Sequence, residues 1–151
     1  MKPLSGIDAA FLALETPETP MHVGALHLYD VPARSRATFH ERARRHVASR
    51  LHLVPVFTRR LATLPLDVAS PVWVEDRAVD LDYHVRRIVL PKPGTLATLE
   101  AAVARLHAQP LDRERPLWIF TVIEGLASGQ VGWYSKIHHA ALDGAAGVQL
   151  A

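Results

Sequence analysis

The sequence predicts a domain of the α/β class, because helical and strand patterns follow one another along the chain without an internal linker. Two segments, 36–53 and 95–108, repeat apolar residues at the three- and four-residue spacing of a helix that buries one face. Around them, short apolar segments of strand length are bounded by proline and glycine. The length of 151 residues and the hydrophobic content of 49% are sufficient for one domain with its own core.

The N-terminal third predicts a helix, a strand and a second helix. Ser5 and Asp8 have the spacing of a capping box, so we expect a helix over residues 5–15, which the following prolines end. Residues 22–29 place apolar side chains on both sides of a strand, which predicts that both of its faces are covered. The helix over 36–53 contains an acidic and a basic residue four positions apart, and a proline closes it.

The rest of the chain predicts five strands and two helices. The strands are two segments joined by a proline-rich turn, one clearly alternating segment, and two segments joined by a loop that contains two glycines. A helix with an apolar stripe precedes the last two strands, and the final residues resemble the first turns of another helix. In chain order, the elements are strands 57–63, 72–75 and 83–90, helix 95–108, strands 118–123 and 131–137, and helix 145–151.

Composition and charge exclude several classes of protein. The formal net charge is +2, with acidic and basic residues interspersed, which argues against a nucleic-acid partner. The chain has no cysteine, so disulfides, thiol catalysis and cysteine-ligated zinc are excluded. No apolar run approaches the ~18 residues that span a bilayer, and the N-terminus has no secretory signal, so we expect a cytoplasmic location.

Two adjacent histidines, His138 and His139, differ from the other seven of the nine histidines, which are scattered singly. They stand at the end of the predicted strand 131–137, and Asp143 and Gly144 follow after three further residues. Successive side chains of a strand point to opposite faces. We therefore expect one of the two histidines to project toward reacting groups and the other to be fixed in the structure.

The residues after the histidine pair predict a rigid loop that enters a helix. Asp143 can cap a helix by accepting backbone N–H groups, and Gly144 permits a backbone conformation that a Cβ atom would forbid. An imidazole held in this way can take a proton from a hydroxyl group at neutral pH. This layout indicates a general base at one of the two histidines. On the motif alone, an ordinary loop followed by a turn is the alternative.

The motif is accompanied by characteristic segments along nearly the whole chain. They are LSGID at 4–8, FL at 11–12, PMHVG at 20–24, DLDYHV at 80–85, LH at 106–107, PLD at 110–112, RPLW at 115–118, VIEG at 122–125 and KIHHAALDG at 136–144. Together these segments resemble the bacterial wax ester synthase/diacylglycerol acyltransferase family. The His-His-x-x-x-Asp-Gly motif by itself is similar to a wider superfamily, which includes chloramphenicol acetyltransferase, carnitine acyltransferases and peptide-synthetase condensation domains.

The resemblance implies a fold and an activity. The fold is a chloramphenicol acetyltransferase-like two-layer domain with a mixed β-sheet and packed helices, the first half of a two-domain protein with the active site between the halves. The activity is transfer of a fatty acyl group from acyl-CoA to the hydroxyl of diacylglycerol or a long-chain alcohol, giving triacylglycerol or wax ester. Acyl-CoA is a co-substrate, and no cofactor or metal is implied.

The resemblance also implies roles for the motif residues. His139 corresponds to the general base, which deprotonates the acceptor hydroxyl so that the alkoxide attacks the thioester directly. His138 is a supporting residue of the motif. Asp143 orients the loop through a charged hydrogen bond, and Gly144 forms the turn. Lipid substrates further imply peripheral contact with the inner membrane or with lipid droplets.

The end of the chain gives an expectation about domain organisation. Residues 145–151 stop inside an apparent helix without a cap, and members of the family are much longer. We therefore expect residues 1–151 to be the N-terminal acyltransferase domain, with the C-terminal domain absent from this chain and supplied by the same protein or by a separate chain. Because that half would form the other wall of the site, we expect the fragment alone to be inactive.

Two other interpretations stay open. A condensation-type amide or ester synthase would share His139 as its base, but it would need a carrier-protein partner, and the Pro-Leu-Trp element argues against it. A non-catalytic half-protein that binds only lipid or a partner chain is compatible with the abrupt end of the sequence. Acyl chain length, the preference between alcohol and diacylglycerol, and the oligomeric state do not follow from the sequence.

Overall fold

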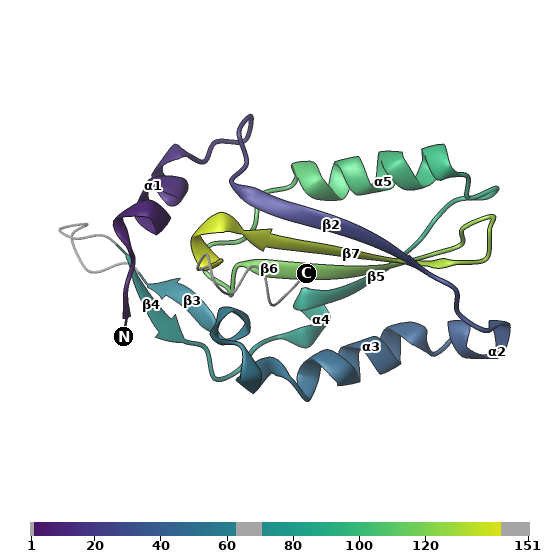
Figure 1. Ribbon diagram of the computed structural model, residues 1–151, viewed down its shortest axis with the longest axis horizontal. Helices are drawn as coiled ribbons and strands as arrows, with labels where there is room; N and C mark the ends of the chain where they lie inside the picture. Colours follow the sequence, from purple (N-terminus) through teal and green to yellow (C-terminus); the bar gives the residue numbers. More distant parts are fainter. Residues whose placement is uncertain (1, 63–70, 143–151) are drawn as a thin grey trace.

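A four-stranded mixed β-sheet forms the centre of the fold (Figure 1). The computed structural model describes residues 2–62 and 71–142. In the sheet, β7 pairs antiparallel with both β2 and β6, whereas β5 lies parallel to β6, which confirms the predicted mixed sheet and α/β class. Three of these strands lie within one residue of their predicted bounds. The strand order is β2 (His22–Tyr29), β7 (Val131–His138), β6 (Trp118–Glu124) and β5 (Val85–Val89).

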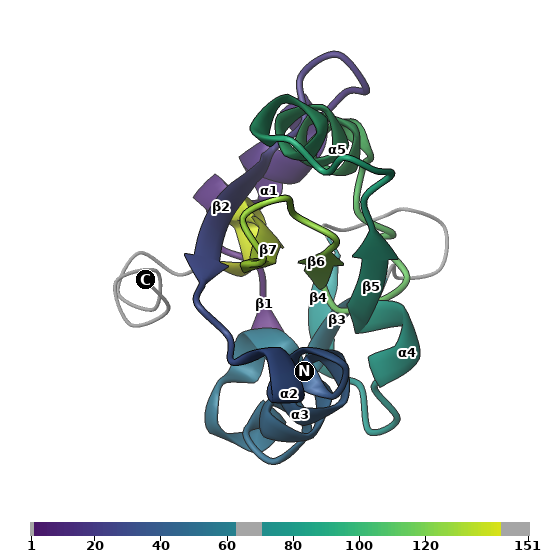
Figure 2. The same ribbon diagram turned by 90° about the vertical axis from the view of Figure 1, so that its right-hand side faces the viewer.

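Helices cover both faces of this sheet (Figure 2). On one face, α5 (Leu96–Ala108) packs against Ile123 of β6. On the other face, α3 (Phe39–Ala48) buries Val47 in a cluster with Phe120 of β6. Strand β6 is buried along nearly its whole length, because apolar side chains on both of its faces meet a helix. The sheet therefore lies between α5 and α3, which confirms the mixed sheet with packed helices that the resemblance implies.

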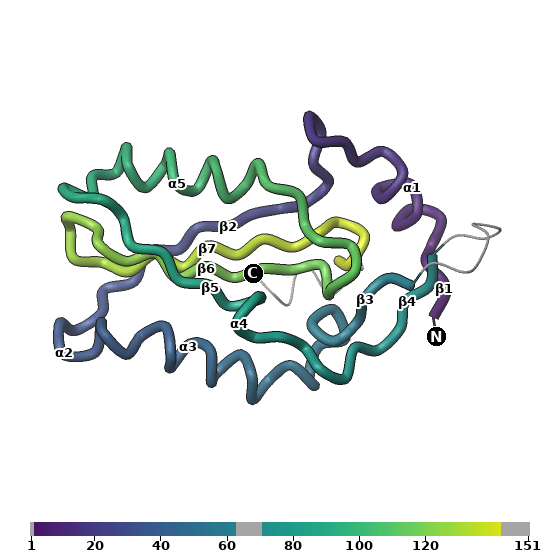
Figure 3. Tube along the Cα trace, turned by 180° about the vertical axis from the view of Figure 1, so that it is seen from behind, coloured from purple at the N-terminus to yellow at the C-terminus, as the bar shows by residue number. Residues whose placement is uncertain are grey.

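A second, antiparallel sheet of three strands lies at the end of the molecule where β7 finishes (Figure 3). Its order is β1 (Lys2–Pro3), β4 (Val72–Glu75) and β3 (Arg59–Ala62). The predicted strand 72–75 is confirmed, and the predicted strand 57–63 is confirmed with shorter bounds. Strand β1 is not predicted by the sequence, because two residues that include a proline carry no alternating pattern.

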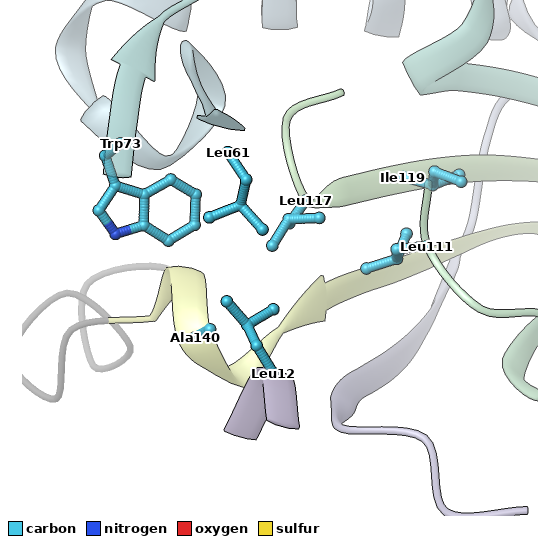
Figure 4. Close-up of a cluster of buried hydrophobic side chains, with 7 residues drawn as sticks. All are labelled: Leu12, Leu61, Trp73, Leu111, Leu117, Ile119 and Ala140. Atoms are coloured by element: carbon cyan, nitrogen blue, oxygen red, sulfur yellow. The ribbon is translucent and has the colours of Figure 1, made fainter. Parts of the chain in front are cut away.

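The first helix, α1 (Gly6–Leu14), confirms the predicted cap. Ser5 Oγ accepts the N–H of Asp8 at 3.1 Å, and Asp8 Oδ2 accepts the N–H of Ser5 at 3.3 Å. The helix packs against the turn that follows β7, where Leu12 and Ala140 share an apolar cluster with side chains of β3, β4 and β6 (Figure 4). This contact fixes α1 beside the residues of the histidine motif.

The predicted helix over 36–53 is wrong in its extent. The segment divides into α2 (Ala33–Arg36), α3 and a 3-10 turn at Leu51–Leu53, and a second 3-10 turn follows at Pro55–Phe57. At the end of α3, the N–H of Arg50 bonds to the carbonyl of Val47, three residues back, which is the 3-10 pattern. Apolar spacing does not detect this change, because side chains three residues apart lie on one side in both helix types.

The predicted strand 83–90 also begins too early. Its first two residues belong to a short helix, α4 (Leu81–His84). The carboxylate of Asp80 caps this helix by accepting the N–H groups of Asp82 at 3.1 Å and of Tyr83 at 3.2 Å. Strand β5 starts only after this turn, so the alternation in the sequence extends beyond the strand itself.

The prediction that both faces of β2 are covered is wrong. β2 is the edge strand of the central sheet, and among the described residues its one neighbouring strand is β7. Four of its large apolar side chains expose between 37% and 45% of their surface: Val23, Leu26, Leu28 and Tyr29. An apolar run shows that the side chains of a strand are suited to burial, but it does not show whether another part of the protein covers them.

The face of the sheet that α5 covers also contains buried polar groups. Lys136 Nζ donates to the carbonyl oxygens of Leu106 at 2.6 Å and of Gln109 at 2.5 Å, at the C-terminal end of α5. Burial lowers the pKa of Lys136 to about 8. On β2, Gly24 leaves room for Tyr134, because a Cβ atom at this position would stand 2.5 Å from Tyr134 Oη.

Two predicted elements fall outside the described residues. They are the proline-rich turn between β3 and β4, at residues 63–70, and the helix at 145–151. Among the helices of the described residues, none has the length and apolar character that crossing a membrane requires.

Candidate active site

The two histidines of the motif lie in different surroundings. His138 is the last residue of β7, and a 3-10 turn, His139–Ala141, begins directly after it. The N–H of His138 bonds to the carbonyl of Leu117, whereas the N–H of His139 bonds to the carbonyl of Met21 on the opposite side. The side chain of His138 is fully buried, and that of His139 is partly exposed. This difference agrees with the expectation that one of the two histidines is fixed in the structure.

His138 is held by a hydrogen bond at one ring nitrogen, and its other ring nitrogen faces Glu15. Nδ1 accepts the N–H of Ala140 at 3.0 Å, so the proton of the neutral ring is on Nε2. Nε2 lies 3.3 Å from Oε1 of Glu15, although this contact does not have the angles of a hydrogen bond. Burial lowers the pKa of His138, while the Glu15 carboxylate acts in the opposite direction. The ring is therefore neutral at pH 7 and connects the turn to Glu15.

Glu15 is a buried carboxylate with three partners. Oε2 accepts a hydrogen bond from Arg113 Nη2 at 2.9 Å, and Oε1 accepts the N–H of Met21 at 3.1 Å and faces His138. Its side chain is only 6% exposed. Burial acts to raise the pKa of Glu15, but the hydrogen bonds from Arg113 and Met21 outweigh it and hold the pKa below its usual value. Glu15 is thus ionised at neutral pH.

His139 has its backbone fixed and its ring directed to a cavity. Its N–H donates to the carbonyl of Met21 at 2.8 Å. Its imidazole stacks on the ring of Phe11, with 4.9 Å between the ring centroids and 18° between the planes. Helix α1 thereby fixes the orientation of the ring, and one side of the imidazole is left open to the cavity.

The cavity beside His139 has a volume of about 720 Å³, within the range of small-molecule sites. Its walls come from the start of the chain and α1, the turn before β3, β4, and the turn that follows β7. Phe11, Val56, Trp73 and other apolar side chains form most of the lining, and Asp8 and Arg59 add charge. The cavity can therefore hold a largely apolar group with its reactive end beside an imidazole.

The other two residues of the motif, Asp143 and Gly144, lie outside the described residues. Their roles as orienting and turn residues remain predictions. Within the described residues, no three histidine, aspartate or glutamate side chains cluster in a way that could hold a metal ion.

The sequence did not identify Glu15 and Arg113 as part of the candidate site. The two residues are 98 positions apart in the chain and meet only because α1 packs against the turn that precedes β6. Neither stands in a short motif that indicates an ion pair. The signal in the sequence that could have identified them is their place beside the segments that carry the family resemblance. Glu15 lies shortly before the segment at 20–24, and Arg113 lies between the segments at 110–112 and 115–118.

Comparison with known proteins shows the family of the chain. The model of the wax ester synthase/diacylglycerol acyltransferase catalytic domain matches residues 4–151. A protein of Mycobacterium tuberculosis (strain ATCC 25618 / H37Rv), whose name proposes a diacylglycerol O-acyltransferase, is 42% identical over 147 residues. This match covers 97% of the present chain and 33% of that protein, so the chain spans about a third of the length of such relatives.

Solved structures show the same fold. The wax ester synthase/diacylglycerol acyltransferase from Marinobacter aquaeolei VT8 superposes with a TM-score of 0.83 at 35% identity, over 99% of this chain and 36% of that one. The starter condensation domain of rhizomide synthetase shares the fold at 16% identity, with a TM-score of 0.71 over 99% of this chain and 34% of that one. By its sequence and its fold, the chain belongs to the wax ester synthase/diacylglycerol acyltransferase catalytic domain family.

Proposed function

We propose that this chain is the N-terminal, motif-bearing domain of an acyl-CoA-dependent O-acyltransferase, with His139 as the general base. The observation that carries the proposal is the different placement of the two histidines. His138 is buried, with Nδ1 bonded to the N–H of Ala140 and Nε2 facing Glu15, whereas His139 has a fixed backbone and lines the cavity. Family membership and the names of relatives at about 40% identity support acyl transfer to diacylglycerol as the class of reaction.

In the proposed reaction, the imidazole of His139 takes the proton of the acceptor hydroxyl as the oxygen attacks the thioester carbonyl of acyl-CoA. The new C–O bond forms, the C–S bond then breaks, and the CoA thiolate takes the proton back from the imidazolium. The fixed backbone of His139 and its contact with Phe11 place the base in one orientation, which is the requirement for efficient proton transfer.

The acceptor in this proposal is the hydroxyl of diacylglycerol or a long-chain alcohol, and the product is triacylglycerol or a wax ester. The apolar lining of the cavity supports a hydrocarbon substrate, since burial of an acyl chain in it removes apolar surface from water. Because such substrates are lipids, the proposed location is the cytoplasm, with peripheral contact between the protein and a membrane or lipid droplets.

The proposal includes a second wall of the site. A C-terminal domain, in the same polypeptide or a separate chain, would supply groups that stabilise the oxyanion of the tetrahedral intermediate. Asp143 would orient the loop and Gly144 would form its turn. Since the proposed oxyanion-stabilising groups would come from the C-terminal domain, we expect the 151-residue chain alone to show no turnover.

The experiment measures acyl transfer from labelled acyl-CoA by the complete protein that carries this chain, with diacylglycerol, a long-chain alcohol and a long-chain amine as separate acceptors. We expect ester products with the first two, and a fall of roughly 10²- to 10⁴-fold in the His139→Ala variant, the usual contribution of a general base. His52→Ala, which removes an exposed histidine, is the matched control and should be fully active. Transfer to the amine alone would favour a condensation-type synthase and contradict the proposal.

A further inference from the structure

We propose that Glu15 is a positioning residue for the reaction, which fixes the backbone on both sides of the His139 side chain. This inference rests on the proposed function, because positioning has a meaning only if His139 is the reacting group. Glu15 does not line the cavity beside His139, so it acts through other residues and not on a substrate.

Two connections from Glu15 reach the turn that carries His139. In the first, Oε1 accepts the N–H of Met21 at 3.1 Å, and the carbonyl of Met21 accepts the N–H of His139 at 2.8 Å. In the second, Oε1 stands 3.3 Å from Nε2 of His138, whose Nδ1 accepts the N–H of Ala140 at 3.0 Å. The N–H of residue 139 is therefore joined to Glu15 Oε1 by hydrogen bonds through Met21, and the ring that holds the N–H of residue 140 faces the same oxygen at 3.3 Å.

Glu15 is itself held firmly enough to serve this role. Arg113 Nη2 donates to Glu15 Oε2 at 2.9 Å and to the carbonyl of Leu12 at 2.7 Å, so the guanidinium connects the carboxylate to the last turn of α1. With its side chain 6% exposed, the carboxylate has little access to water and depends on these partners. Its position is thereby set by the helix and not by solvent.

The same helix also contacts the ring of His139. Phe11 and Glu15 are four residues apart, so they lie on the same side of the end of α1. Phe11 stacks on the imidazole, while Glu15 reaches the backbone of the turn through its two connections. The end of α1 thus controls both the position and the orientation of the proposed base.

The expected effect of disturbing Glu15 is a loss in kcat without a matching change in KM. The Glu15→Gln variant keeps the size of the side chain and an acceptor for Met21, but it removes the charge that faces Arg113 and His138. Misplacement of a catalytic group by about 1 Å can reduce turnover roughly 100-fold, so we expect kcat to fall roughly 10- to 100-fold. The KM values for acyl-CoA and the acceptor should stay within about twofold, since no substrate contact is lost.

The test uses steady-state kinetics of the complete protein that carries this chain, with folding checked by urea unfolding. Glu41→Gln is the matched control, because Glu41 pairs with Arg45 on the exposed side of α3, away from the His139 turn, and it should behave as wild type. Glu15→Asp is a second variant, in which the charge opposite Arg113 is kept but the carboxylate is withdrawn by about 1.5 Å, one carbon–carbon bond. It should fold and still lose kcat.

The outcomes separate this inference from the proposed function. A fall of kcat in both Glu15 variants with KM unchanged, beside an inactive His139→Ala variant, supports the positioning role. Wild-type kcat in a folded Glu15→Asp variant beside an inactive His139→Ala variant would overturn the positioning role and leave the proposed function standing. Full activity of His139→Ala would overturn both.

Discussion

Replacing His138 by alanine should destabilise the fold by about 3 kcal/mol, although its neighbour is the proposed base. The side chain of His138 is only 1% exposed, and truncation of a ring in such a site costs about 2 kcal/mol in packing. The N–H of Ala140 also loses its acceptor, His138 Nδ1, which adds about 1 kcal/mol for a buried donor without a partner.

The same substitution at His139 should cost about 1 kcal/mol or less. The residue is partly exposed, and among the described residues the aromatic contact that its ring loses is the stack on Phe11. A stacked pair contributes about 0.5–1.5 kcal/mol, toward the lower end where solvent has access. The backbone bond from His139 to Met21 does not involve the side chain and is kept.

Urea unfolding followed by tryptophan fluorescence measures both losses. With a slope of about 2 kcal/mol per molar urea, the midpoint should fall by about 1.5 M in His138→Ala and by about 0.5 M or less in His139→Ala. His138→Asn is the control, because its Oδ1 can replace Nδ1 as acceptor for Ala140 and should recover about 1 kcal/mol. Equal midpoints for the two alanine variants, or a larger loss at His139, would refute the assignment of His138 as the fixed residue.

Three further predictions concern the surrounding fold. Gly24→Ala should lower the free energy of unfolding by about 1–3 kcal/mol, because the new Cβ atom would stand 2.5 Å from Tyr134 Oη. In a double-mutant cycle, Tyr134→Phe removes that oxygen and should reduce the loss. Ser5→Ala removes the cap of α1 and should cost about 1 kcal/mol in the same urea assay, and an unchanged midpoint would contradict the capping role. Burial lowers the pKa of Lys136 to about 8 from its ordinary 10.5, so the unfolded chain binds more protons than the folded chain between these pH values. The free energy of unfolding of wild type relative to that of Lys136→Met should therefore rise with pH over this window. A difference between the two proteins that is constant with pH would contradict this prediction.

The parts of the fold that the sequence predicts well are those with strong local patterns. Helix α5 combines an apolar stripe with the cap at Thr95, whose side chain accepts the N–H of Thr98. Strands β6 and β7 are apolar runs of strand length, separated by a loop in which Gly125 and Gly129 both have positive φ. In each case the information lies within about a dozen neighbouring residues, so no knowledge of the tertiary structure is needed.

The parts that the sequence does not predict depend on contacts between distant residues. The exposure of β2 follows from its edge position, which no pattern within residues 22–29 reports. The pair of Glu15 and Arg113 joins residues 98 positions apart, so neither local sequence contains the other half of the interaction. By contrast, the different surroundings of His138 and His139 could be predicted, because strand alternation sends adjacent side chains in different directions.

The most direct test of the central claim is chemical rescue of His139→Ala by imidazole. The substitution removes the proposed base from the wall of a cavity of about 720 Å³ that a free imidazole can enter. CoA release by the complete protein that carries this chain is followed with a thiol reagent, and these 151 residues contribute no cysteine to the signal. We expect negligible turnover without imidazole and turnover that rises with imidazole concentration. Wild-type turnover of His139→Ala in the absence of imidazole would contradict it.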